Sequence, residues 1–146
     1  MLAKLMMALM PKKQMLKMFT IAFKSKRSIQ SIVDDVEEVC AEYRFALLHH
    51  YNYHEVVANK GFPIDRKVYI YEICQAKVAS MMLTSNPHFA PFMPCRIAVY
   101  EEGDTTIIST QNMQMMIDLI QSQEQLHSEA IRLFTALQNM MKKLKG

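Results

Sequence analysis

The chain has 146 residues, of which 51% are hydrophobic, with only three glycines and five prolines. This composition excludes a disordered chain, and at this length one domain can bury roughly two-thirds of its unfolded surface without a metal or disulfide framework. Three cysteines, an odd number, argue against a disulfide scaffold and favour a reducing, cytoplasmic setting.

The charge is divided unevenly along the chain. Seven Lys or Arg residues fall within residues 1–27, and no acidic residue precedes Asp34, whereas the remainder has ten basic and fourteen acidic residues. Such a basic segment is suited to binding phosphate groups or an anionic membrane surface. The simpler interpretation is that its lysines are only solvated. Nucleic acid binding is supported by nothing else in the sequence, so we do not expect it.

Residues 1–17 are interpreted as an apolar and basic N-terminal extension, and residues 18–146 as a single domain. A short helix is expected before Pro11, and four of its residues share one apolar face: Leu2, Leu5, Met6 and Leu9. The segment lacks the charge order of a secretory signal and is too short to span a bilayer. We expect it to dock on a partner, a second subunit or the chain's own body, with contact to a membrane surface as the weaker alternative.

The next elements follow from hydrophobic periodicity. Alternation over residues 19–23 predicts a half-buried strand, and Ser28 is an N-cap for an amphipathic helix that runs to Tyr43 with an acidic outer face. Residues 45–53 predict a second strand, and residues 67–74 a third.

The second half of the chain continues this mixed pattern. Residues 75–84 predict a helix, and a proline-containing loop leads to a fourth strand at residues 95–101. A Glu-Gly-Asp turn joins this strand to a fifth at residues 105–110, which predicts an antiparallel hairpin. A helix at residues 113–121 precedes a final, core-facing helix from about Gln125, with apolar residues at spacings of four and three: Leu126, Ala130, Leu133, Leu137, Met140 and Leu144.

The resulting order, β-α-β-β-α-β-β-α-α, is too mixed for a regular α/β wind and predicts a single α+β domain. The stretch Pro94-Cys95-Arg96-Ile97-Ala98-Val99-Tyr100-Glu101 resembles the strand signature of the domain of unknown function 302 family. Similarity extends over roughly residues 18–121, with Gln75-Ala76 and Asn112-Met113 at positions where that family usually has Asn-Pro and often has Asp-Pro. The resemblance implies an antiparallel-dominated sheet backed by helices, often in a homodimer, and implies no particular activity.

Cys74 and Cys95 are the sharpest candidates for chemistry, because they fall at the ends of two predicted strands. A thiol pair there can bind a soft metal or cycle with a disulfide, but free cysteine is more often a small buried hydrophobe. Whether the two thiols meet depends on the relative direction of the strands, which the sequence leaves open. Cys40, on the apolar face of its helix, is interpreted as core.

Histidine and methionine give weaker signals. His88, Met93 and Cys95 are close enough in sequence to ligate a haem iron or copper, although their spacing matches no standard motif. His49 and His50 point to opposite faces of one strand, so at most one of them faces the core. Most of the fourteen methionines fall at core spacing or in the N-terminal segment.

From these patterns we expect a non-enzymatic binding or interaction domain, homodimeric, that holds an apolar small molecule or a protein partner between sheet and helices. The alternative is a thiol-redox or soft-metal or haem-linked protein that uses Cys74 and Cys95. The sequence assigns no catalytic residue and identifies no cofactor. The expected ligand-binding residues are Cys74, Cys95, Met93, His88 and His49.

Overall fold

The computed structural model describes the backbone of residues 1–146 and every side chain except those of Ala3 and Met7. Its centre is a five-stranded sheet in which every neighbouring pair is antiparallel, in the order β1-β5-β4-β3-β2. The strands are β1 (Thr20–Ser25), β2 (Ala46–Asn52), β3 (Val68–Cys74), β4 (Cys95–Glu102) and β5 (Thr105–Gln111). The predicted α+β class, with an antiparallel sheet backed by helices, is confirmed.

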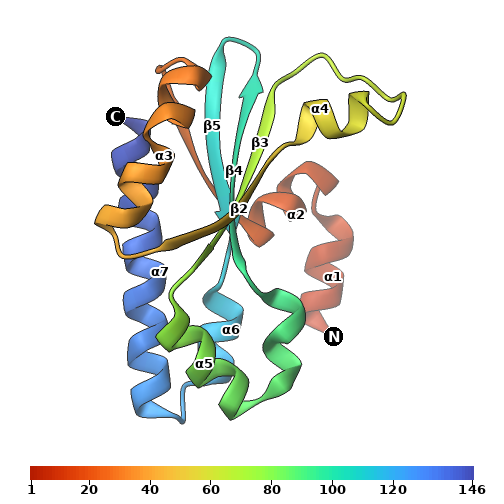
Figure 1. The fold of residues 1–146 in the computed structure, drawn as a ribbon. Helices are drawn as coiled ribbons and strands as arrows, with labels where there is room; N and C mark the ends of the chain where they lie inside the picture. Colours follow the sequence, from red (N-terminus) through yellow and green to blue (C-terminus); the bar gives the residue numbers. More distant parts are fainter.

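The helices are distributed unequally around this sheet (Figure 1). α3 (Ile29–Glu42) and α7 (Glu124–Lys145) cover one face, and they contact each other as well as the strands. α5 (Ala76–Ser85), the 3₁₀ helix η1 (Pro87–Phe92) and α6 (Gln114–Leu119) gather at one end of the strands. α1 (Leu2–Leu9), α2 (Lys12–Phe19) and α4 (Tyr53–Ala58) lie on the side opposite α3.

Local sequence signals explain where α3 begins and where β4 turns into β5. The side chain of Ser28 accepts a hydrogen bond from the Ser31 N–H at 3.2 Å, which is the predicted N-cap of α3. Gly103 adopts φ 60° in the tight connection between β4 and β5, where Glu102 pairs with Thr105. Glycine reaches this left-handed conformation without steric cost, so the predicted hairpin forms.

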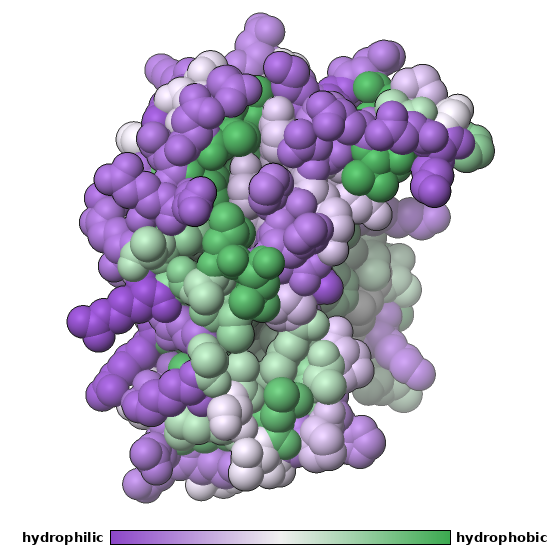
Figure 2. Space-filling view, viewed as in Figure 1, coloured by the Kyte–Doolittle hydropathy of each residue, from purple (hydrophilic) through white to green (hydrophobic). Residues whose placement is uncertain are grey.

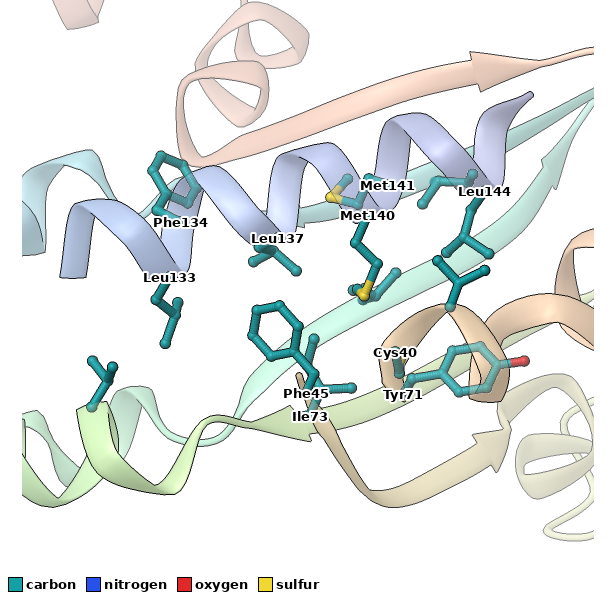
Figure 3. Close-up of a cluster of buried hydrophobic side chains, with 14 of the residues drawn as sticks. Cys40, Phe45, Tyr71, Ile73, Leu133, Phe134, Leu137, Met140, Met141 and Leu144 are labelled. Atoms are coloured by element: carbon teal, nitrogen blue, oxygen red, sulfur yellow. The ribbon is translucent and has the colours of Figure 1, made fainter. Parts of the chain in front are cut away.

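The hydrophobic core lies between the sheet and the helix pair α3 and α7. Every member of the predicted apolar series on α7 is buried, and Figure 3 shows this helix facing Phe45, Ile73 and Tyr71. Cys40 of α3 is fully buried in the same cluster, as expected for a core cysteine. Burial raises the pKa of its thiol to about 11, with a smaller contribution from Glu37, so Cys40 is protonated at neutral pH.

Arg27 joins the start of α3 to the end of α7. Its guanidinium donates to the Leu144 carbonyl at 2.9 Å, to the Ser31 hydroxyl at 2.6 Å and to the Asp35 carboxylate at 2.5 Å. The nearby hydroxyl of Ser25 donates to the Lys145 carbonyl at 2.6 Å. Carbonyls in the last turn of a helix lack partners within the helix, so these donors cap α7 from a segment more than 110 positions away.

The structure differs from the predictions at three places. The segment before Pro94 contains the 3₁₀ helix η1 rather than an irregular loop, and Asn86 caps it by accepting from the His88 N–H at 2.9 Å. Residues 53–58 form α4, a helix that was not predicted, and its first residue, Tyr53, is the last residue of the predicted second strand. The Val68 N–H donates to Nδ1 of His54 at 3.1 Å, and this contact from β3 holds α4 in place. Phe19 ends α2 instead of opening β1.

Candidate ligand-binding cavity

A cavity of about 340 Å³ opens at the end of the sheet where β3 finishes and β4 begins. Cys74, the last residue of β3, and Cys95, the first of β4, both line it. The remaining wall comes from Leu48 of β2, from α5, η1 and α6, which gather below these strand ends in Figure 1, and from the first half of α7. The cavity therefore lies between sheet and helices, at one end of the core rather than in its middle.

Each helix contributes apolar side chains at helical spacing. α5 supplies Val78 and Met82, four residues apart and therefore on one face, and α7 supplies Ala130 and Leu133, three apart. η1, α6 and the segments beside the strand ends complete the wall with further apolar side chains: Phe89, Phe92, Met93, Met113, Met116, Ile117 and Ile120. Packing of these helices around the ends of β3 and β4 leaves this space between them.

The mouth of the cavity is marked by lining residues that are exposed to solvent, namely Leu48, Leu83 and Phe92. Figure 2 shows hydrophobic residues gathered in a band over the middle of this side of the molecule, from β2 down toward α5, between hydrophilic margins. An apolar molecule can therefore reach the cavity across an apolar surface.

The lining is almost free of polar groups. In the described part of the chain, no charged side chain lines the cavity, and Gln75 contributes its only side-chain amide. That amide donates to the Tyr43 carbonyl at 3.3 Å, so one of its hydrogen-bonding groups already has a partner. Burying an unpaired charge is costly, so this lining selects against charged ligand groups.

The two candidate cysteines lie on neighbouring antiparallel strands but are offset by one residue. Cys95 is directly opposite Ile73, and Cys74 follows Ile73 in β3. Opposed residues share a face of the sheet and successive residues alternate, so Cys95 faces the core with Ile73 while Cys74 projects to the other face. The cavity reaches both because it lies at the strand ends, and both thiols are free.

The environment of Cys95 keeps its thiol neutral. Burial is the main cause, and the neighbouring Cys74 adds to it, so that the pKa of the Cys95 thiol is raised to about 11. The thiolate is the nucleophile and the metal ligand, and a buried apolar setting disfavours it. Near neutral pH, Cys95 therefore behaves as part of the apolar wall.

The structure divides the five residues that the sequence singled out. Cys74, Cys95 and Met93 line the same cavity, whereas His88 and His49 do not. His88 is exposed on η1 and lines a separate hollow with Asn86 and Gln123. His49 is exposed on β2, with its ring 4.5 Å from that of Tyr51.

Sequence reasoning missed most of the wall. Leu133 belongs to the predicted core face of the last helix, and Val78 and Met82 repeat at helical spacing in the predicted helix at residues 75–84. Nothing in such a spacing separates a packed residue from one that borders a cavity. Within the described side chains, no group of three or more His, Cys, Asp or Glu residues is arranged to hold a metal ion. In the described residues, no helix has both the length and the apolar character needed to cross a bilayer.

Comparisons with known proteins identify a matching family and a solved structure with a similar fold. The family model of the domain of unknown function DUF302 matches residues 21–144. The crystal structure of an uncharacterised conserved DUF302 protein from Bacillus stearothermophilus is similar with a TM-score of 0.75 at 22% identity, covering 87% of this chain and 98% of that one. No curated protein matches the sequence. The match over most of its length shows that this chain belongs to the DUF302 family.

Proposed function

We propose that this protein is a binding domain that holds an uncharged, apolar small molecule in the cavity at the ends of β3 and β4. The observation that carries the proposal is the cavity itself, with its volume of about 340 Å³ and its almost wholly apolar wall. Small-molecule sites typically measure roughly 300–1,000 Å³ and combine an apolar lining with a few polar groups. This cavity lies at the lower end of that range.

The chemistry of the wall defines the class of ligand. An apolar body fits against Val78, Met82 and Leu133, where it replaces water that has few polar partners. A polar end group belongs at the mouth, near Leu83 and Phe92, because no lining side chain carries a compensating charge among the described residues. We therefore expect a compact hydrocarbon or aromatic molecule with at most one polar end.

A cavity-filling variant tests this proposal. Ala130 is buried in the cavity wall on α7, so Ala130→Leu places additional methyl groups in the space meant for the ligand. Ala136→Leu, on the same helix but outside the cavity, is the matched control. The neutral fluorophore N-phenyl-1-naphthylamine reports binding through its increased emission in an apolar environment.

Wild type is expected to bind this fluorophore saturably at one site, and Ala130→Leu to weaken binding about tenfold or more, since the added side chain excludes the probe. Ala136→Leu should bind like wild type. Thermal unfolding of both variants verifies that they remain folded. Probe binding that is absent from wild type, or that Ala130→Leu leaves unchanged, contradicts the proposal.

The sulfur content of the wall supports a second candidate, a soft-metal site. Two thiols and four thioethers line the cavity, from Cys74, Cys95, Met82, Met93, Met113 and Met116. Thiolate and thioether ligands select Cu(I). The raised pKa of the Cys95 thiol works against this role, because the metal has to displace a tightly held proton. Metal analysis after Cu(I) loading under reducing conditions, on wild type and Cys95→Ala, distinguishes the two: retained copper that depends on Cys95 favours the metal site.

A further inference from the structure

The N-terminal helices carry their apolar residues toward solvent instead of toward the body. On α1, Leu2, Leu5, Met6 and Leu9 share one face, with exposed fractions of 74%, 60%, 59% and 79%. α2 has no buried residue, and Leu16, Met18 and Phe19 are also exposed. A helix that stabilises its own domain buries such a face, so these two helices, here called the helical arm, are arranged for an external surface.

The charge of the helical arm is entirely positive. Lys4, Lys12, Lys13 and Lys17 lie within it, and no acidic residue occurs before Asp34. An amphipathic segment with lysines beside an exposed apolar face binds at the interface of an anionic bilayer, where the apolar residues enter the headgroup region and the lysines meet the phosphates.

A second element on the same side of the molecule has the same character. The loop at residues 59–67 follows α4, which lies with α1 and α2 on the side of the sheet opposite α3 (Figure 1). Phe62 in this loop is 74% exposed and Ile64 is also exposed. Lys60, Arg66 and Lys67 outnumber the single acid, Asp65.

The outer surface of α3, on the opposite side of the sheet, is acidic. Asp34, Glu37 and Glu38 lie on the exposed surface of α3, which is separated from the helical arm by the sheet. With the arm on a bilayer, these carboxylates face away from the anionic headgroups. The acidic surface of α3 therefore does not oppose contact between the arm and a negative surface.

We propose that the helical arm and the loop at residues 59–67 form a face that binds the surface of an anionic lipid bilayer. A second copy of the chain is the competing occupant of this face. To accept the arm, a pocket on that copy needs both an apolar lining and acidic residues. Among the pockets of the described residues, the strongly apolar one is the ligand cavity, and its lining includes no acid to pair with the arm's lysines. The DUF302 match begins at residue 21, so the arm lies outside the matched region.

Co-sedimentation with phosphatidylcholine vesicles, with and without phosphatidylserine, tests this face in the full chain. Wild type is expected to bind only the vesicles that contain phosphatidylserine, and to dissociate as salt screens the lysines. Lys12→Glu with Lys13→Glu should reduce partitioning about tenfold or more, since each lysine near the surface contributes about fivefold. The matched control is Lys142→Glu with Lys145→Glu, at the exposed end of α7, which should change partitioning by less than about threefold.

The apolar contribution has its own pair of variants. Leu5→Asp with Leu9→Asp should abolish vesicle binding, whereas Leu119→Asp on α6, at a residue with a similar exposed fraction of 76%, should not. The proposal is overturned if wild type ignores phosphatidylserine, or if the arm variants bind as their controls do. It is also overturned if light scattering shows a dimer that Leu5→Asp with Leu9→Asp dissociates, or if these variants lower the thermal midpoint, because the arm then belongs to a subunit interface or to the core.

Discussion

Cys95 lies directly opposite Ile73 in the antiparallel pairing of β3 and β4, and it shares the buried face of the sheet with that residue. Cys74 is therefore one position out of register with Cys95, and the alternation of the strand turns its side chain to the other face. The strands have the antiparallel arrangement that brings the two thiols into the same region, but the register does not aim them at each other. This offset bears on whether the pair can form a disulfide.

We predict that Cys74 and Cys95 do not form an intramolecular disulfide. A disulfide needs Cβ atoms about 3.5–4.5 Å apart with side chains directed at each other, and the offset denies that geometry. The protein is incubated with oxidised glutathione, mixed disulfides with glutathione are identified by mass spectrometry, and the remaining thiols are titrated in denaturant. These measurements should reveal no crosslink within the chain. A Cys74–Cys95 peptide pair in the digest is the result that would prove this wrong.

Stability should fall at high pH because of Cys95. Its folded-state pKa of about 11 exceeds the ordinary value of 9.0, so between these values the folded chain binds more protons than the unfolded chain. The contribution is fully present below about pH 9 and is lost as the pH rises toward 11, by about 2 kcal/mol. Denaturant unfolding of wild type and Cys95→Ala across this range measures it. Because tyrosines and lysines titrate in both proteins, a constant difference between the two curves would contradict the prediction.

The core face of α7 should account for a large share of stability. Leu137 is fully buried against the sheet, so Leu137→Ala should lower the free energy of unfolding by about 2–5 kcal/mol. Ile131 lies on the same helix but is exposed, and Ile131→Ala should cost less than about 1 kcal/mol. Denaturant melts of both variants give the comparison, and similar losses would mean that α7 also buries its outer face, for instance in a dimer.

Arg27 should matter more than its partial exposure suggests. Arg27→Ala leaves the Leu144 carbonyl and the Asp35 carboxylate without their donor, and we expect a loss of about 2 kcal/mol in the free energy of unfolding. Arg27→Lys should recover only part of it, because a single ammonium group cannot reproduce the forked contacts. Lys26→Ala, at the exposed neighbouring position, is the control and should be close to neutral. An Arg27→Ala variant as stable as Lys26→Ala would rule out this capping role.

The N-terminal extension should be dispensable for folding. Deleting residues 1–17 removes side chains that contact little of the body, since α2 has no buried residue and the apolar face of α1 is exposed. The thermal midpoint should therefore shift by no more than a few degrees. A scanning calorimetry trace that drops by many degrees would place the extension within the cooperative unit.

Features that depend on neighbours along the chain could be predicted from the amino-acid sequence. The N-cap at Ser28 needs only a hydroxyl three residues before an N–H, and the turn at Gly103 needs only a residue that accepts a positive φ. The buried face of α7 follows from spacings of three and four, because the helix has one period whatever it packs against. These elements were found where they were predicted.

Features that depend on contacts between distant segments became visible only in the folded chain. Sequence placed Cys74 and Cys95 at strand ends, but the pairing of β3 with β4 set their offset, and no local pattern encodes a register. Val78 and Leu133 have the same periodicity as packed core residues. They border a cavity because α5 and α7 leave a space between them at the strand ends. α1 shows the converse: the sequence leaves open whether its apolar face docks on a partner, a second subunit or the chain's own body. In the structure this face is exposed, and α3 and α7 cover the core face of the sheet without it.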